Sequence, residues 1–250
     1  MDANLFIGKK LIELDSVDST NNYLSKLINE TNVPNGSVIL AHNQTKGRGQ
    51  RGNDWESENG KNLTFSIYLK TNFVSLKNNF LLSIVICNSV HKLVSNYCNN
   101  TRIKWPNDLL ISGNKTAGIL IENTLKGANL NHSIIGIGLN VNQTIFSENS
   151  KATSMFLSAK NDIDKNYLLN QYFKILEIEF RKLELNKTEE IKAYYFSNLI
   201  GYKTELNYLI VKENKEVKGE ILEVKNNGFL VMKIDQNEVR EFEMKEVKLL

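Results

Sequence analysis

The feature that most constrains the fold is a change in the hydrophobic pattern near residue 200. Before it, strand-like runs alternate with apolar stretches of helical spacing; from Gly201 onward, short β-rich runs follow one another between polar turns. Closely spaced short strands are typical of a small barrel. A chain of 250 residues has room for one medium-sized domain and one small one. We therefore predict a mixed α+β domain over residues 1–199 and an all-β barrel over residues 200–250.

The expected elements leave one long polar connection, at residues 44–61. Such connections inside a compact domain are usually functional or disordered. The stretch 79–97 is apolar on most sides, which indicates a buried helix. The alternating and helical patterns predict strands at residues 11–17, 37–42, 62–70, 102–105, 108–112, 115–125 and 130–142, a helix that Ser19 or Thr20 can cap, further helices at 79–97, 165–185 and 188–198, and barrel strands at 204–211, 216–224, 228–234 and 240–249.

The charge balance gives little sign of a nucleic-acid partner. The chain has 31 basic and 28 acidic residues, a net charge of +3, which is too small to indicate one. Residues 201–250 carry nine basic and ten acidic side chains, which argues against a phosphate-binding face on the barrel. We expect the barrel to be a packing or docking module.

Hydropathy and cysteine usage point to a cytoplasmic protein with no membrane partner. No apolar run approaches the ~20 residues that cross a bilayer. The first fifteen residues lack the layout of a signal peptide. Cys87 and Cys98 are the only cysteines and lie in an apolar segment, so a buried structural role is favoured over a disulfide or a metal site.

The long polar connection contains the run QTKGRGQRGNDW, Gln44 to Trp55. Its glycines permit close approach of the backbone, and arginine donates forked hydrogen bonds to carboxylates or phosphates. The run suits a loop that encloses an anionic ligand; the alternative is a flexible, solvated basic loop. It matches neither the Walker phosphate loop nor a dinucleotide fingerprint followed by a helix.

Two further motifs lie between predicted strands. In KWPND, Lys104 to Asp108, Pro106 fixes a sharp corner that projects Asn107 and Asp108, either toward a ribose or a magnesium-bound phosphate or simply as a rigid turn. In KTAGILIE, Lys115 to Glu122, the lysine either places its ammonium in a pocket or is an ordinary exposed hairpin residue.

Glycines also recur within these predicted strands. Gly118, Gly136 and Gly138 weaken strands unless another group approaches closely, so together they would leave room for a flat ligand ring.

Taken in order, the motifs resemble the biotin protein ligase family, that is, biotin–[acetyl-CoA-carboxylase] ligases. The resemblance rests on Ser19-Thr20-Asn21, QTKGRGQRGNDW, KWPND, KTAGILIE and the closing GIGLNVN, and it extends over essentially the whole chain. It implies a mixed-sheet, biotin/lipoate ligase-like catalytic domain followed by an SH3-like barrel. It also implies an enzyme that forms biotinyl-5′-AMP from biotin and ATP, with Mg²⁺. That enzyme then transfers biotin to a lysine of a biotin carboxyl carrier protein, such as that of acetyl-CoA carboxylase or a related carboxylase.

The resemblance also implies a role for individual residues. Lys115 and Arg48 would be catalytic, and Asp108 would lie near the phosphate and its Mg²⁺, with no further metal ligand assigned. The residues implied in biotin binding are Ser19, Thr20, Asn21, Gln44, Gly47, Arg48, Gly49, Gln50, Lys115 and Gly118. Those implied in nucleotide binding are Arg51, Trp105, Asn107, Asp108, Lys115 and Asn140.

The sequence departs from the family pattern at two positions of the loop. Gln50 and Asn53 stand where many members have arginine, so one cation facing the adenylate is missing or supplied from elsewhere. No aromatic residue in the range 150–157 is assigned to adenine stacking. The triplet begins at residue 19, which leaves no room for the N-terminal DNA-binding domain of the repressor type, so no DNA partner is expected.

Three points stay open at this level. Lipoate ligases and octanoyltransferases share the fold and are the nearest alternative activity, although they lack KWPND followed by K-x-AG. A non-catalytic binding module on the same scaffold is the other alternative. The sequence does not determine whether the chain forms a homodimer.

Overall fold

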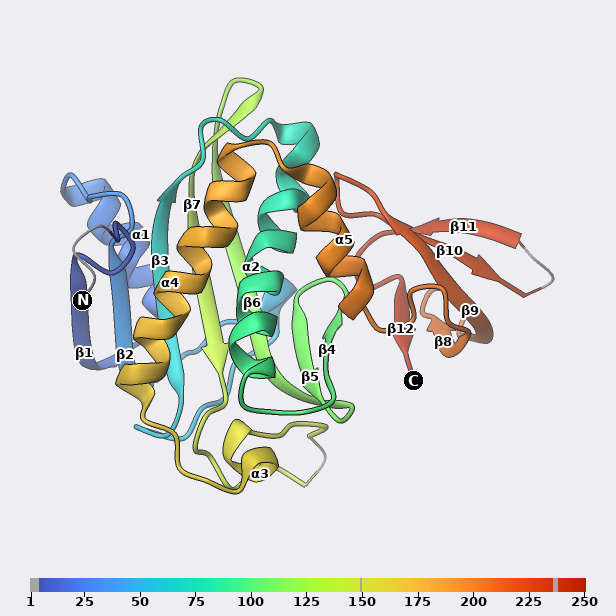
Figure 1. Cartoon of the computed structure of the whole chain (residues 1–250), viewed down its shortest axis with the longest axis horizontal. Helices are drawn as coiled ribbons and strands as arrows, with labels where there is room; N and C mark the ends of the chain where they lie inside the picture. The colour runs from blue at the N-terminus through green and yellow to red at the C-terminus, as the bar shows by residue number, and fades with distance from the viewer. Residues whose placement is uncertain (1–4, 149, 236–237) are drawn as a thin grey trace.

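The computed structural model describes residues 5–148, 150–235 and 238–250, which form two β-sheets with helices (Figure 1). The first and larger part contains β1 (Leu11–Val17), α1 (Thr20–Glu30), β2 (Val38–Gln44), η1 (Gln50–Gly52), β3 (Leu63–Lys70), η2 (Leu76–Asn78), α2 (Asn79–Ser95), β4 (Thr101–Lys104), β5 (Asp108–Ile111), β6 (Asn114–Lys126), β7 (Asn129–Leu139), α3 (Met155–Ala159), α4 (Lys165–Glu184) and α5 (Thr188–Asn198). The second part contains β8 (Leu206–Ile210), β9 (Lys215–Val224), β10 (Leu230–Ile234), β11 (Glu238–Phe242) and β12 (Val247–Leu249).

The larger sheet has seven strands in the order β1-β2-β3-β7-β6-β5-β4. β1 and β2 are parallel, and the other neighbours are antiparallel. The smaller sheet is antiparallel in the order β11-β10-β9-β8-β12. A mixed sheet with helices, followed by a separate antiparallel sheet, confirms the predicted fold class.

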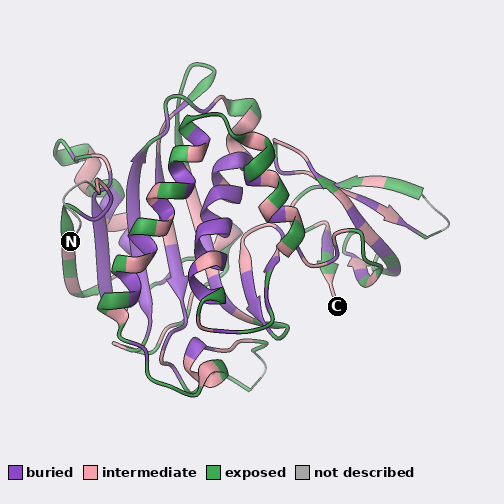
Figure 2. Ribbon diagram, in the orientation of Figure 1, coloured by how far each residue is buried: buried purple, intermediate pink, exposed green. Residues whose placement is uncertain are grey.

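The two faces of the large sheet pack against different helices. Side chains alternate between the faces of a strand, so in β2 Val38 and Leu40 join the main core while Ile39 joins a smaller cluster with Leu24 of α1. α2 and α4 cover the main-core face, and α2 is purple along most of its length in Figure 2. The opposite face packs against α1 at β2, β3 and β7.

Differences from the predicted elements are concentrated where the pattern is short or interrupted. α2 ends at Ser95 rather than at residue 97, and α3 and the two short 3₁₀ turns were not predicted. The run 240–249 is two strands, β11 and β12, because a turn with Lys245 at φ 76° separates them. Periodicity cannot detect this turn, because Glu243 and Met244 continue the polar–apolar alternation of Glu241 and Phe242.

Hydrogen bonds attach the smaller sheet to the end of the larger one. Ile200 N–H donates to the Ile103 carbonyl at 2.9 Å, and Trp105 Nε1–H donates to the Gly228 carbonyl at 3.1 Å. The corner after β4 is therefore in direct contact with the C-terminal part. None of the helices in the described residues is long and apolar enough to cross a membrane.

Candidate active site

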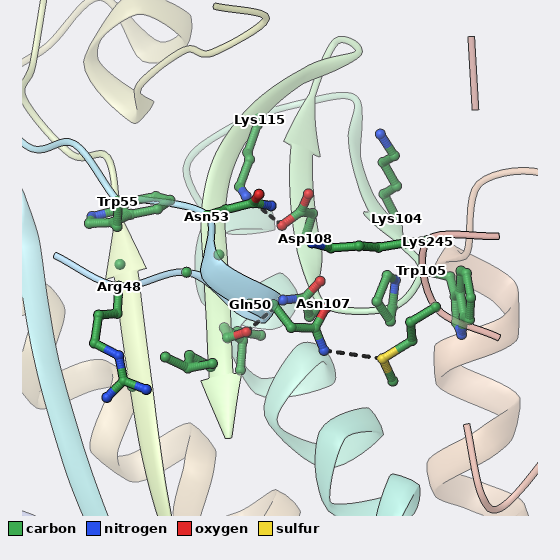
Figure 3. A pocket seen from close by; sticks show the side chains of 18 of the residues that line it. Arg48, Gln50, Asn53, Trp55, Lys104, Trp105, Asn107, Asp108, Lys115 and Lys245 are labelled. Atoms are coloured by element: carbon green, nitrogen blue, oxygen red, sulfur yellow. Dashed lines mark hydrogen bonds and ion pairs between the residues drawn. The ribbon is translucent and has the colours of Figure 1, made fainter. Parts of the chain in front are cut away.

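A cavity of about 340 Å³ lies on the α1 face of the large sheet, where the polar connection 44–61 and the C-terminal sheet meet it. Trp55, Asn107, Asp108 and Lys115 are among the side chains that surround it in Figure 3. Twelve of the residues to which the resemblance assigns a catalytic or binding role line it: Ser19, Thr20, Asn21, Gln44, Arg48, Gly49, Gln50, Trp105, Asn107, Asp108, Lys115 and Gly118. The fold thus brings residues of four motifs to one place: Ser19-Thr20-Asn21, QTKGRGQRGNDW, KWPND and KTAGILIE.

One end of the cavity is a corner of buried, uncharged polar groups at the start of α1. Gln44 Oε1 accepts hydrogen bonds from Thr20 N at 2.8 Å and Thr20 Oγ1 at 3.1 Å. Ser66 Oγ lies 2.7 Å from Thr20 Oγ1 and 2.5 Å from Asn21 Oδ1. Ser19, Thr20 and Asn21 are each buried. Fixed neutral donors and acceptors of this kind suit a neutral polar ligand head.

Glu122, at the end of the KTAGILIE motif, connects this corner to the loop. Its carboxylate accepts from Asn21 Nδ2 at 2.7 Å and from an Arg48 guanidinium nitrogen at 2.8 Å. The other end of the guanidinium donates to Asn22 Oδ1 at 2.5 Å. Arg48 therefore ties the loop to both β6 and α1. Sequence reasoning missed Glu122 and Asn22 as site residues, although each lies within or next to a motif that it had singled out.

The loop that contains the run Gln44 to Trp55 folds back on itself. Gly49 N–H donates to the Asn53 carbonyl at 2.6 Å, and Trp55 N–H donates to the Gly47 carbonyl at 3.0 Å. A Cβ at Gly47 would lie 2.3 Å from the Trp55 carbonyl oxygen. Gly47 is thus required for the fold-back and does not line the cavity. The side chain of Arg51 lies outside the described part of the structure.

Trp55 occupies the room that the strand glycines provide. A Cβ at Gly138 would lie 2.2 Å from Trp55 Cε2, and one at Gly118 would lie 3.1 Å from Trp55 Cζ3. The room beside Gly118 and Gly138, which the sequence analysis assigned to a flat ligand ring, is therefore filled by the protein's own indole. A Cβ at Gly136 would instead meet Asn21 Oδ1 at 2.4 Å. Within the described residues Trp55 Nε1 is buried with no hydrogen-bond partner.

Lys115 and Asp108 form the charged centre of the cavity. Lys115 Nζ lies 2.7 Å from Asp108 Oδ1 and 5.6 Å from the centroid of the Trp55 ring. The lysine side chain is 38% exposed and the aspartate 22%, so both are open to a ligand. Lys115 is therefore a cavity residue and not an ordinary exposed hairpin lysine.

The KWPND corner contains a cis peptide bond between Trp105 and Pro106. Asn107 Nδ2 donates to the Ile119 carbonyl at 2.7 Å, and Ile119 N–H donates to the Asn107 carbonyl at 3.1 Å. The corner is thus a rigid turn anchored to β6, and it also lines the cavity. The rigid-turn reading of the motif therefore holds: Asn107 anchors the turn and Asp108 faces Lys115. Contact with a ribose or a magnesium-bound phosphate stays a prediction.

Sequence and structure comparisons with known proteins show which family the chain belongs to. Residues 13–140 match the model of the biotin/lipoate A/B protein ligase family. The chain belongs to this family. It is 30% identical over 234 residues to the bifunctional ligase/repressor BirA of Bacillus subtilis, covering 92% of this chain and 71% of that protein. It is 30% identical over 146 residues to the biotin–[acetyl-CoA-carboxylase] ligase of Mycobacterium tuberculosis, covering 57% of this chain and 53% of that one.

Among solved structures, the chain is similar to the biotin protein ligase from Aquifex aeolicus in complex with biotin and ATP. The TM-score is 0.77 with 29% sequence identity, over 97% of this chain and 99% of that one. The similarity extends over both sheets, so the C-terminal sheet is part of the shared architecture.

Asn140, in the GIGLNVN motif of this family member, lies outside the cavity lining. It is buried, and its Nδ2 donates to the Thr153 carbonyl at 3.0 Å. Thr153 N–H in turn donates to the Lys115 carbonyl, and Lys115 N–H donates to the Lys151 carbonyl, both at 2.8 Å. Asn140 therefore holds the segment that pairs with the backbone of Lys115.

The C-terminal sheet lines the cavity, which the sequence did not indicate. Its contributions are Tyr208, Val211, Ile221, Leu230, Met244, Lys245, Val247, Lys248 and Leu249. Gln50 Nε2 donates to Met244 Sδ at 3.1 Å, which links the loop directly to this sheet. The C-terminal part is thus more than a packing module, because it forms one wall of the cavity.

Asp108 is the residue that the sequence analysis placed near a magnesium-bound phosphate. No group of three or more His, Cys, Asp or Glu side chains that could hold a metal ion occurs among the residues the structure describes. The cavity wall offers Asp108 as a carboxylate that could face a metal ion bound to a ligand phosphate.

Proposed function

We propose that the chain is a biotin protein ligase: it forms biotinyl-5′-AMP from biotin and ATP, and then transfers biotin to a lysine of a biotin carboxyl carrier protein. The observation that carries the proposal is the Lys115–Asp108 pair, which lies in one cavity with the uncharged corner at Thr20 and Asn21. That cavity has a neutral recognition end and a charged reaction centre. The named relatives and the Aquifex aeolicus complex with biotin and ATP support the choice of substrates.

The uncharged corner suits the ureido ring of biotin. A ureido group is neutral and offers two N–H donors and one carbonyl acceptor. Thr20, Asn21 and Gln44 present amide and hydroxyl groups whose orientations are held by their hydrogen bonds to one another and to Ser66 and Glu122. These partners already hold the amide and hydroxyl groups in place. The side chains therefore lose little conformational freedom when the ligand binds.

The first step brings two anions together at Lys115. A carboxylate oxygen of biotin attacks the α-phosphorus of ATP, the bond from that phosphorus to the bridging oxygen breaks, and pyrophosphate leaves. The Lys115 ammonium offsets the repulsion between carboxylate and phosphate. Asp108 faces the same centre and would contact Mg²⁺ carried by the nucleotide, which supplies further positive charge.

The second step needs no nucleophile from the enzyme. The amine of the acceptor lysine attacks the acyl carbon of the mixed anhydride, and AMP leaves. Cys87 and Cys98 are both buried, and His42 pairs with Glu13, so none of these side chains serves as an acyl carrier. The loop held by Arg48 limits access of water to the anhydride.

The domain boundary and the compartment follow from the same proposal. Residues 1–199 form the catalytic unit, and residues 200–250 form an SH3-like unit that completes its cavity. Two unpaired, buried cysteines fit a reducing compartment, so the reaction takes place in the cytoplasm.

The decisive test is transfer of radiolabelled biotin to a purified carrier domain, with ATP present or omitted. We expect label on the carrier only with ATP, and none on a carrier whose acceptor lysine is replaced by arginine. Lipoate in place of biotin serves as the control for the neighbouring activity in the family. Tight biotin binding without transfer would refute the proposal and support a binding module.

A further inference from the structure

Gln143 is a buried amide that joins three segments of the chain just outside the cavity. Its side chain is 7% exposed, and it is not among the residues that line the cavity. Its Oε1 accepts hydrogen bonds from Asn62 Nδ2 and from Glu58 N–H, the latter at 3.2 Å, and its Nε2 donates to the Ile145 carbonyl at 2.7 Å. One side chain thus connects the end of the loop at residues 44–61, the start of β3 and the stretch that follows β7.

Asn62 holds the same junction with both atoms of its amide. It is buried between the end of the loop and the stretch after β7. Its Nδ2 also donates to Ser57 Oγ at 3.0 Å, and its Oδ1 accepts from Val141 N–H at 2.9 Å. Because both amides are buried, removing one partner leaves polar groups that water does not readily satisfy. The end of the loop is therefore fixed firmly to the stretch after β7.

The stretch after β7 leads on to the backbone of Lys115. Asn140, at its beginning, donates through Nδ2 to the Thr153 carbonyl at 3.0 Å. Lys115 N–H donates to the Lys151 carbonyl and the Lys115 carbonyl accepts from Thr153 N–H, both at 2.8 Å. These contacts hold β6 at the residue whose ammonium lies in the cavity.

The loop approaches the same lysine from the cavity side. The centroid of the Trp55 ring lies 5.6 Å from Lys115 Nζ. A Cβ at Gly118 would lie 3.1 Å from Trp55 Cζ3 and 3.3 Å from Lys115 Nζ, so the indole and the ammonium share the space above this glycine. Figure 3 shows both side chains at the cavity. Lys115 is thus held at its backbone by residues 151–153 and meets the loop at its ammonium, and Gln143 joins these two supports.

We propose that Gln143 is a positioning residue for Lys115: with Asn62 it makes the loop and the stretch beside Lys115 move as one unit. This inference rests on the proposed function. Adenylate formation requires the Lys115 ammonium at a fixed place between the carboxylate and the α-phosphate. A misplacement of about 1 Å in such a site can cost about a hundredfold in rate. Gln143 lies outside the cavity, so it acts through Lys115 and the loop and touches no substrate.

The test uses the full chain with Gln143→Leu, which keeps the approximate size of the side chain and removes all of its hydrogen bonds. Gln143→Glu is the conservative variant, because its carboxylate can still accept from Asn62 and Glu58. The matched control is Gln171→Leu in α4, on the face of the sheet away from the cavity. The amide oxygen of Gln171 accepts from the Tyr97 hydroxyl at 2.9 Å, so this control also removes a side-chain hydrogen bond.

Three measurements compare each variant with the unaltered chain. Biotin-dependent pyrophosphate release gives kcat and KM for biotin. Limited digestion with trypsin gives the rates of cleavage after Lys46 in the loop and after Lys151 beside β6, both of which are exposed. Thermal unfolding gives the stability. Trypsin digestion requires no catalytic activity, so it tests the junction independently of the proposed function.

We expect Gln143→Leu to lower kcat by about tenfold or more. KM for biotin should stay near that of the unaltered chain, because the uncharged corner at the start of α1 is not changed. Trypsin should cut faster after Lys46 and after Lys151 alike, since both segments lose a shared anchor. Gln143→Glu should recover much of the lost kcat. Gln171→Leu should lower the unfolding temperature and leave kcat unchanged.

An unchanged kcat in folded Gln143→Leu would overturn the positioning role. An equal loss of kcat in Gln171→Leu would overturn it too, because lower stability would then account for the effect. Faster cleavage after Lys151 alone, with the loop cut as in the unaltered chain, would show that the junction does not join the two segments. Absence of pyrophosphate release from the unaltered chain would instead refute the proposed function, and the cleavage rates would still decide whether the junction holds.

Discussion

Replacing Gly138 with alanine should disturb the loop through one side chain, the indole of Trp55. The added Cβ would lie 2.2 Å from Trp55 Cε2, 2.5 Å from Cζ2 and 2.6 Å from Nε1. Carbon atoms in contact are ~3.5–4.0 Å apart, so the indole must withdraw by more than about 1 Å. Gly138 is not among the glycines with positive φ, so the backbone itself accepts alanine.

Two opposing terms determine the size of the effect. Alanine in a strand is favoured over glycine by about 0.5–1 kcal/mol, whereas overpacking of this kind costs about 1–3 kcal/mol. The cost of overpacking should exceed the gain from alanine, so we expect Gly138→Ala to lower the free energy of unfolding by about 1–2 kcal/mol. Gly118→Ala should cost less, because its Cβ would meet Trp55 Cζ3 at 3.1 Å and otherwise the flexible end of Lys115.

Urea denaturation followed by tryptophan fluorescence measures this directly, because Trp55 is one of only two tryptophans. The emission of folded Gly138→Ala should shift to the red as the indole leaves its site. Removing the indole with Trp55→Ala should abolish the penalty of the second substitution in a double-mutant cycle. A Gly138→Ala variant at least as stable as wild type, with no coupling to Trp55, would refute the packing argument.

Three other outcomes follow from individual contacts. Arg48→Ala should speed the release of biotinyl-5′-AMP, since Arg48 ties the loop to Asn22 and Glu122; an unchanged off-rate measured by stopped flow would contradict this role. Glu122→Gln should raise the same off-rate while costing at most about 1 kcal/mol of stability, because this ion pair is half exposed. Burial raises the pKa of Cys87 to about 12 and also raises that of Cys98, so a thiol reagent near neutral pH should label the chain in urea but not when folded.

Much of the fold could be predicted because its elements have regular patterns. β3, β7 and α2 are largely buried, and each one's own residue sequence shows this as an apolar pattern. Such elements can be predicted without knowing which other segments they contact. The ordered motifs also predicted that Lys115, Asp108 and the start of α1 belong to one site, and in the structure all three line one cavity. Glycines in the strands correctly indicated a close approach.

The rest depends on contacts between distant segments. Gly138 shows that something approaches, but nothing local shows that it is Trp55 and not a ligand. Glu122 resembles any polar strand residue until Asn21 and Arg48 are placed beside it. The net charge of residues 201–250 is a sum over the whole C-terminal part. It therefore gives no sign that Lys245 and Lys248 line the cavity.

The central claim is that Lys115 activates the reaction between biotin and ATP, and biotin-dependent pyrophosphate release tests it most directly. The comparison is between the unaltered chain, Lys115→Ala, and Lys126→Ala at the exposed far end of the same strand, β6. We expect normal release with Lys126→Ala and a loss of at least about a hundredfold with Lys115→Ala, the size expected when one group that stabilises developing charge is removed. Wild-type release of pyrophosphate by folded Lys115→Ala would contradict it.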